Sequence, residues 1–434
     1  MDFNFDSLQS YAQSCLRLAE AALSDFDSPK AVAEATESLN LYPNLSALKA
    51  PWSVRSLEDY EGLNELGRQA VLAGRIFWEH PVAGEATRLG VGRKFLLTPS
   101  FLVTQAAARG LVEAKEYNDL LPINLGFRHL MQPLLEISLL ADCFGVSPVE
   151  AIRNQRMLII NASDDGEKPS GLNQAIAKAF SKIMPLENIL FMTQASFYGL
   201  NRQKGGSWYF DQNSPKRLHN HGQMVMQKTM ENQIYHLDDV GNSVFLDRAS
   251  FFSLLDEYED LVSYNIEDLD FLTSALDLAA LGLAVRLGRS GYGMVMEIIL
   301  NNPQRPIKGG MCAHDSVLNL DVVVESFRLR DISPLDIKFL NKNFNHYPRP
   351  AKVLGSLREK GLFMPVKVID DRLYFQPVQG DLNFLTRTAF FTRRASATIN
   401  SLKAPVDIPA ALAAMKAQDS QKGFRELSEL LGLL

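Results

Sequence analysis

The feature of the sequence that most restricts its fold is an alternation of short apolar runs with helical stretches after Gly74. Helical patterns over residues 172–183 and 272–287 lie between these runs, which cover residues 157–160, 189–192, 261–264, 294–300 and 318–324. Short continuous apolar runs are typical of strands that are buried on both faces. Strands that alternate with helices form a largely parallel sheet with helices on both sides. The pattern therefore predicts an α/β fold.

The two ends of the chain read as helix. Apolar residues recur at three- and four-residue spacing over residues 8–22, and again over 409–434. A further helix is expected to begin with Ser56 as its N-cap and to end at Gly74. We expect three regions: an N-terminal helical region (1–70), an α/β catalytic domain (71–345) and a C-terminal region with a terminal helix (346–434).

Composition excludes several classes of protein. The 434 residues are 46% apolar and 22% charged, which is ordinary for a globular chain. They include 44 Lys and Arg against 50 Asp and Glu, a net charge of −6. Binding to nucleic acid or to an anionic membrane requires clustered positive charge, so neither partner is expected.

The expected location is the cytoplasm. The three cysteines, Cys15, Cys143 and Cys312, are far apart and odd in number, which fits a reducing compartment. The acidic N-terminus lacks the positive region of a signal peptide. The longest apolar stretch, residues 278–285, is far shorter than the roughly 20 residues that span a bilayer.

One loop carries residues suited to phosphate. A strand expected over 76–82 leads into small residues, among them Ala83, Gly84 and Thr87, and then to Arg88 and Lys94. A tight turn after a strand can direct several backbone N–H groups at one anion, and two permanent positive charges would neutralise a triphosphate. A solvated surface turn would show the same residue types.

This stretch resembles the signature of the UDP-sugar pyrophosphorylase family, particularly its UDP-N-acetylhexosamine branch. The family's loop has the form AGGxGTRLG followed by PK. Its pattern is matched here by the following positions: Ala83, Gly84, Thr87, Arg88, Leu89, Gly90 and Lys94. The glycine run is replaced by Gly84-Glu85-Ala86, and Arg93 stands where the family has Pro. The resemblance implies a GT-A-like or Rossmann-like mixed sheet.

Later segments resemble the family in the same order. Gln194 ends a strand as the family's uracil-side glutamine does, and Asn220, His221 and Gly222 fall where relatives have a loop that contacts base and sugar. Residues 264–269 resemble the "VDN" segment, which implies that Glu267 and Asp268 hold Mg²⁺ and phosphates. The resemblance also implies sugar contacts for Glu325 in a "VVEYS"-like segment and for Asn345 in an "NxxNHF"-like one. Ser326 replaces the Tyr common in relatives.

Some of these residues also fit ordinary structural roles. Glu267 and Asp268 could be acids at a helix N-terminus, although hard carboxylate oxygens are what Mg²⁺ prefers. His221 could be a loop histidine. Asp164-Asp165-Gly166 is expected to form a turn, and the pair Arg393-Arg394 is expected to be surface charge.

The activity that the resemblance implies joins UTP and a sugar 1-phosphate to give a UDP-sugar and pyrophosphate. Lys94 and Arg88 would be its catalytic residues. Two alternatives remain open. A glycosyltransferase of the same architecture could use Asp268-Leu269-Asp270 as a DxD motif. A family member with an altered glycine loop could bind a nucleotide or nucleotide sugar without turnover.

Overall fold

The structure of the chain is a computed structural model. It describes residues 40–52, 54–84, 92–162, 171–194, 198–202, 208–215, 221–304, 306, 309–329, 332–362, 366–369, 372–393 and 401–434. The helix expected over residues 8–22 and the turn expected at Asp164–Gly166 lie outside these ranges.

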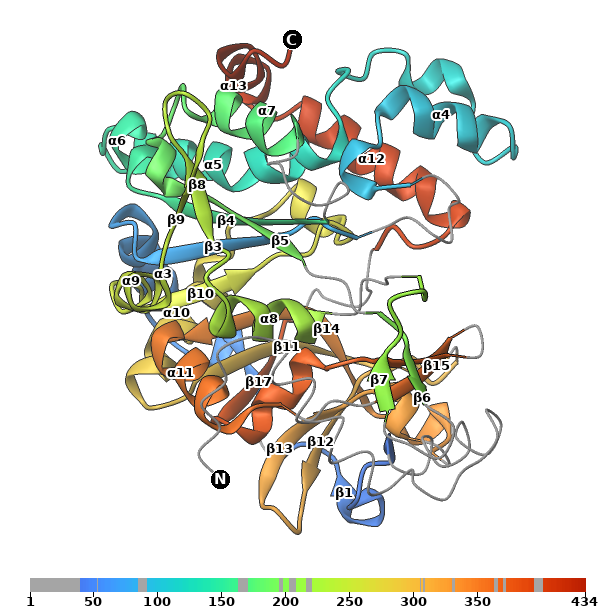
Figure 1. Cartoon of the computed structure of the whole chain (residues 1–434). Coiled ribbons are helices and arrows are strands. Elements are labelled where there is room, and N and C mark those ends of the chain that lie inside the picture. Colours follow the sequence, from blue (N-terminus) through green and yellow to red (C-terminus); the bar gives the residue numbers. More distant parts are fainter. Residues whose placement is uncertain are drawn as a thin grey trace.

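A large mixed sheet runs through the molecule (Figure 1). Its strands follow one another in this order: β2 (Val54–Ser56), β17 (Thr388–Thr392), β11 (Met294–Leu300), β14 (Phe339–Pro348), β10 (Asp260–Ser263), β3 (Ile76–Pro81), β4 (Arg156–Ala162), β5 (Ile189–Gln194), β8 (Tyr235–Leu237) and β9 (Ser243–Phe245). β10, β3, β4 and β5 are mutually parallel, as are β2, β17 and β11. β14 is antiparallel to both of its neighbours. The predicted largely parallel α/β sheet is confirmed.

Helices cover both faces of the sheet (Figure 1). The helices that contribute to the larger core are α3 (Leu63–Leu72), α4 (Pro99–Ala107), α5 (Leu125–Cys143), α6 (Pro148–Arg153), α7 (Gly171–Phe180), α10 (Leu278–Arg289), α12 (Ile408–Asp419) and α13 (Phe424–Leu431). The second core lies under α8 (His221–Met230), α9 (Arg248–Leu255) and α11 (Pro350–Lys360). Within the described ranges, no helix is both long and apolar enough to cross a membrane.

Two smaller units accompany the main strands: a hairpin that belongs to the large sheet, and a second sheet. β12 (Met311–Asp315) and β13 (Leu320–Val324) form a hairpin that pairs with β1 (Leu48–Lys49). A separate sheet has the order β15 (Val366–Ile369), β16 (Arg372–Phe375), β6 (Leu200–Arg202) and β7 (Trp208–Phe210). The apolar run expected over 318–324 thus contains a strand only from Leu320 onward. Asn319, with a φ of 54°, belongs to the turn of the hairpin.

Helix α3 begins later than its sequence predicts. Its N-cap is Gly62 rather than Ser56, because the residues after Ser56 form a separate 3₁₀ turn (Leu57–Asp59). The predicted end is confirmed, since Gly74 has a φ of 67°, which glycine adopts without strain. The expected domain boundary between residues 345 and 346 falls inside β14, and β17 from the C-terminal region pairs with β11. The division into three regions stays a prediction.

Candidate active site

The candidate site lies along the edge of the sheet where its parallel strands end. β3, β4, β5 and β10 all run in one direction, so their carboxyl ends meet at a single edge. β11 and β17 end at the same edge, because β14 is antiparallel to both β10 and β11. Ligands of open α/β sheets bind outside the carboxyl ends of the strands. Most of the described site residues predicted from the sequence lie at or next to this edge.

The loop after β3 returns to the sheet edge at Lys94. Ala83 is buried and Gly84 is exposed, and the carbonyl of Gly84 accepts a hydrogen bond of 3.2 Å from the backbone N–H of Lys94. Lys94 opens a short 3₁₀ helix (Lys94–Leu96) whose Phe95 is fully buried. The bond brings Gly84 and Lys94 next to each other. Thr87 and Arg88 belong to the segment between them and lie outside the described residues.

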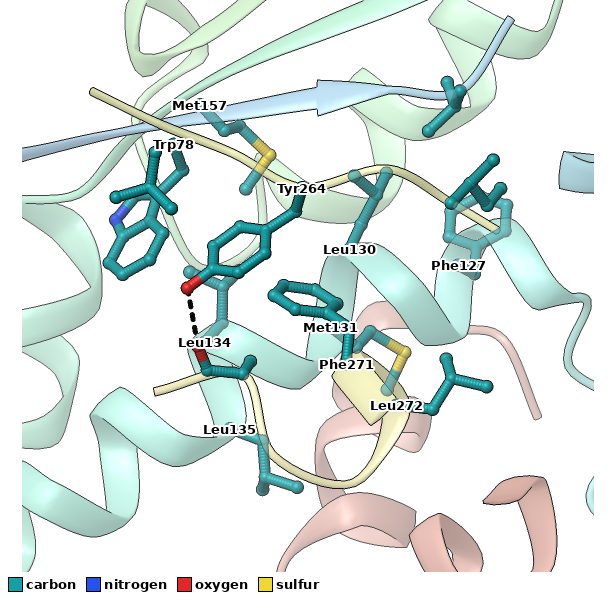
Figure 2. Close-up of a cluster of buried hydrophobic side chains, with 14 of the residues drawn as sticks. Trp78, Phe127, Leu130, Met131, Leu134, Leu135, Met157, Tyr264, Phe271 and Leu272 are labelled. Carbon is teal, nitrogen blue, oxygen red and sulfur yellow. Dashed lines mark hydrogen bonds between the residues drawn. The ribbon is translucent and has the colours of Figure 1, made fainter. Parts of the chain in front are cut away.

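The loop after β10 carries alternating apolar and acidic residues. Tyr264, Ile266, Leu269, Phe271 and Leu272 are each no more than 3% exposed. Figure 2 shows Tyr264 and Phe271 packed toward the side chains of α5, and the Tyr264 hydroxyl donates a hydrogen bond of 2.6 Å to the carbonyl of Ala275. Burial of these apolar side chains fixes the path of the loop.

Two lysines meet one carboxylate at this edge, and we call Lys94, Lys403 and Glu267 the basic cluster. The ammonium of Lys94, whose side chain is 7% exposed, lies 2.6 Å from Glu267 Oε2. The ammonium of Lys403 lies 3.3 Å from Glu267 Oε1. Two cations against one carboxylate leave an excess of positive charge beside the loop after β3. An anionic group such as a phosphate is attracted to such a place.

Acids outnumber cations in the neighbouring part of the edge. The acidic cluster consists of Asp268, Asp270, Asp277 and Glu297, with Lys342 and Arg393 among them. Lys342 Nζ lies 3.5 Å from Asp270 Oδ2 and 3.6 Å from Glu297 Oε1. Arg393 pairs with Asp277, and also with Glu297 at 3.0 Å.

The surroundings of the acidic cluster shift the pKa values of its members. Burial raises the pKa of Asp268 to about 6; the Lys342 ammonium opposes this shift, and the Asp270 carboxylate adds to it. Burial works against the charged form of Lys342, but Glu297, Asp268 and Asp270 together raise the pKa of its ammonium. Burial, more than the neighbouring charges, is therefore the reason that the carboxyl group of Asp268 resists ionisation.

Glu325 and Asn345 were predicted to contact a sugar. Glu325 follows β13, and burial raises the pKa of its carboxyl group, while Arg328 and Lys403 oppose this shift. The influence of Lys403 indicates that Glu325 lies near the basic cluster. Asn345 is 4% exposed and pairs in β14 with Ser263 of β10, and its Oδ1 has no hydrogen-bond partner within the described ranges. A buried acceptor of this kind can receive a hydrogen bond from a ligand hydroxyl.

The predicted base-binding residues are described only in part. Gln194 ends β5 at the same edge and is 8% exposed. Asn220 lies outside the described residues, and so does the side chain of His221, the first residue of α8. A Cβ on Gly222 would lie 2.3 Å from the carbonyl oxygen of Pro377. The packing of α8 therefore requires glycine at this position, whatever its role toward a ligand.

Sequence reasoning missed two lysines and misjudged one arginine. Lys342 and Lys403 follow no motif that was recognised, although both reach the site. Arg393 was expected to be surface charge; that prediction is wrong, because its guanidinium is mostly buried and paired with Asp277 and Glu297. Its acidic partners lie about a hundred residues away in sequence, so no local pattern could have revealed them.

The residues present fit a divalent ion better at Asp268 than at Glu267. Both oxygens of Glu267 lie next to ammonium groups, which would repel a second cation. Asp268 belongs to the cluster with excess negative charge. In the part of the chain that the structure describes, no three His, Cys, Asp or Glu side chains gather as metal ligands. An ion held by Asp268 would therefore need phosphate oxygens for its remaining ligands, as Mg²⁺ commonly does.

Comparison with solved structures relates the fold to that of known enzymes. The UDP-N-acetylglucosamine pyrophosphorylase of Trypanosoma brucei, in complex with an inhibitor, aligns over 98% of this chain and 85% of its own. The TM-score is 0.58 and the identity 13%. A variant of the UDP-glucose pyrophosphorylase of Leishmania major in complex with UDP-glucose aligns over 93% of this chain and 79% of its own, with a TM-score of 0.55 and 14% identity.

Comparisons of the sequence with known protein families and with curated proteins give no match. At such low identity, the similarity to solved structures shows a shared fold. The resemblance to UDP-sugar pyrophosphorylases that the loop motif indicated is thus confirmed at the level of the fold.

Proposed function

We propose that this protein is a nucleotidyltransferase of the UDP-sugar pyrophosphorylase type, which joins UTP and a sugar 1-phosphate. The observation that carries the proposal is the basic cluster at the carboxyl edge of a sheet whose solved relatives include an enzyme in complex with UDP-glucose. Lys94 and Lys403 are far apart in the sequence, and both contact Glu267 in the loop after β10.

In the proposed reaction, a phosphate oxygen of the sugar 1-phosphate attacks the α-phosphorus of UTP. The bond from the α-phosphorus to the bridging oxygen of the β-phosphate breaks, and pyrophosphate leaves with the electron pair. Lys94 would contact the triphosphate and stabilise the leaving pyrophosphate, together with Arg88. Lys403 would hold a phosphate oxygen of the incoming sugar phosphate. Such a reaction depends on positioning and on charge stabilisation rather than on covalent catalysis.

The other predicted residues would bind the base, the sugar and the metal ion. Gln194 and residues 220–222 would bind the base, and Glu325 and Asn345 would accept hydrogen bonds from sugar hydroxyls. Asp268, with Glu267 nearby, would hold Mg²⁺. When bound, the ion would supply positive charge to phosphate oxygens.

The test is pyrophosphate release by the purified protein from UTP with N-acetylglucosamine 1-phosphate or glucose 1-phosphate. We expect turnover with at least one sugar phosphate, and a loss of about 100-fold or more in the Lys94→Met variant, since a charge aimed at the transition state is removed. Lys115→Met is the matched control, because Lys115 is exposed and pairs locally with Glu113. Wild-type turnover in Lys94→Met would contradict the role of this lysine.

Two results would contradict the proposed reaction itself. UTP or UDP-sugar binding without turnover would identify a binding protein. Consumption of a UDP-sugar without a requirement for pyrophosphate would identify a glycosyltransferase or a hydrolase.

A further inference from the structure

One face of α5 carries a row of polar residues inside a mostly apolar helix. Arg128, Gln132 and Glu136 are spaced four residues apart, so they lie one above another on the same face. Arg128 and Gln132 are fully buried. Buried polar groups are costly unless they are hydrogen-bonded, so the partners of this row indicate what it holds in place.

Arg128 binds the C-terminal helix α12. Its guanidinium donates hydrogen bonds to Asp419 Oδ1 at 2.7 Å, to Gln418 Oε1 at 3.2 Å and to the carbonyl of Met415 at 3.3 Å. Other bonds from the same guanidinium reach carbonyls of the segment before α5. The end of α12 is therefore fixed to the start of α5.

Two glutamines continue the row. The side-chain amide of Gln418, itself fully buried, donates to the carbonyl of Arg128 at 3.1 Å and to Gln132 Oε1 at 2.7 Å. The amide of Gln132 donates to Glu136 Oε1 at 2.6 Å and to Gln421 Oε1 at 2.9 Å. Every donor and acceptor of the Gln132 and Gln418 amides is used, which makes the row a specific arrangement.

The far end of the row holds the loop that follows the acidic cluster. The Glu136 carboxylate accepts hydrogen bonds from the backbone N–H of Ala275 at 2.8 Å and of Leu276 at 2.6 Å. Gln421 donates to the carbonyl of Thr273 at 3.1 Å. These residues lie between Asp270 and Asp277 in the sequence.

The row fixes α12, and the segment that leads into α12 carries Lys403. The N–H of Leu402 donates to the carbonyl of Glu267 at 2.9 Å, and Ser401 forms a bridge with Asp268. The 3₁₀ turn Pro405–Asp407 leads from Lys403 into α12, and Asp407 accepts the N–H of Lys403 at 2.8 Å. Glu267 and Lys403 are therefore both placed with reference to α5.

We propose that Gln132, Gln418 and Gln421 are positioning residues, which hold Lys403 and the loop of Glu267 in place against α5 through the polar row. The inference rests on the proposed function, and it names the part of the fold that aligns the sugar phosphate with the basic cluster. Loosening the row would displace Lys403 while the base-binding side of the site, at the end of β5, stays intact.

The test compares Gln421→Met with Gln132→Met. Gln421 is only partly buried, so Gln421→Met is expected to fold even if Gln132→Met does not. The Gln421→Met variant loses the hydrogen bond to the carbonyl of Thr273. We expect both the KM and the Kd for the sugar 1-phosphate to rise about tenfold, with the Kd for uridine unchanged, because Lys403 is displaced and the end of β5 is not. Lys182→Met is the control, since it loosens the C-terminal segment at the Leu431 carbonyl without removing a hydrogen bond of the row.

A double-mutant cycle separates positioning from general loosening. If the row acts through Lys403, then Gln421→Met adds nothing to KM in a Lys403→Met background. Multiplied effects in the double variant, or an unchanged Kd for the sugar 1-phosphate in both single variants, would overturn the inference.

A wild type that turns over no sugar phosphate would contradict the proposed function separately. Hydrogen exchange over residues 264–276 then tests the row in Gln421→Met: faster exchange supports it and unchanged exchange overturns it.

Discussion

At the scale of single residues, Asp268 shows how burial in the site changes the pKa of a carboxyl group. Its carboxyl group has a pKa of about 6 because burial, with a smaller contribution from Asp270, works against ionisation. The unfolded chain ionises the same group near pH 4. Ionisation in the folded protein therefore costs stability as the pH rises from about 4 to about 6, and the cost persists at higher pH.

We expect Asp268→Asn to stabilise the protein at pH 7–8 by about 2–3 kcal/mol and to have only a small effect at pH 4, because the folded chain is then protonated and the unfolded chain is about half protonated. Asparagine keeps the oxygen that accepts the N–H of Asp270. Urea unfolding of both proteins at pH 4, 6 and 8 measures the difference. An equal gain at every pH would show that charge is not the cause.

Local sequence predicts single residues of the site only where a motif carries them. Two motifs single out Lys94 and Glu267, which are 173 residues apart, and the structure pairs their side chains. Their roles stay predictions. Lys403 and Lys342 were missed, since a single lysine has no sequence pattern of its own. Ion pairs between distant segments are set by the tertiary fold, and this is also why Arg393 was wrongly expected on the surface.

At the scale of elements, α3 and α10 approach closely through two glycines. A Cβ on Gly282 would lie 2.0 Å from the carbonyl oxygen of Leu63, and a Cβ on Gly67 would lie 2.0 Å from that of Leu278. The helices must move apart to accept a larger residue. Gly355 in α11 offers the opposite case, because the nearest atom to its Cβ would be 4.0 Å away.

We expect Gly282→Ala to destabilise the protein by about 1–3 kcal/mol through overpacking. Gly355→Ala should stabilise it by about 0.5–1 kcal/mol, because alanine is the better helix former and meets no clash. Chemical denaturation of the two variants measures both effects. If Gly282→Ala were as stable as the wild type, the close helix contact would be wrong.

The elements predicted best are those whose sequence signal lies within one short, continuous stretch. The apolar runs of β4, β5, β10 and β11 identify buried strands, and Gly74 identifies the end of α3. Helix α5 was missed although it is 19 residues long, because it is apolar on most sides, contains Pro133 and buries Arg128, His129 and Gln132. Polar residues that a helix buries against distant partners hide its amphipathic pattern.

At the scale of the whole molecule, the sheet and its larger core unite segments from much of the chain. β2, near the start of the described residues, pairs with β17, near their end, and both belong to the sheet that holds β3 and β10. The larger core includes residues from Leu63 to Leu431. Contacts of this kind couple the stability of distant segments.

We expect calorimetry of the wild type to show one unfolding transition, which Gly282→Ala moves as a whole to lower temperature. The matching signal is the loss of helix by circular dichroism at the same temperature. Two resolved transitions, with the C-terminal helices melting first, would mean that the C-terminal region is a separate unit.

The most direct test of phosphate binding by the basic cluster is calorimetric titration of UTP and of uridine into the wild type and into Lys94→Met. If the basic cluster binds the phosphates, the wild type binds UTP, and the variant loses about tenfold or more in UTP affinity, which corresponds to about 1.4 kcal/mol. Uridine affinity should be the same for both proteins. Equal UTP affinity in the two, or no UTP binding by the wild type, would contradict a phosphate site at Lys94, Lys403 and Glu267.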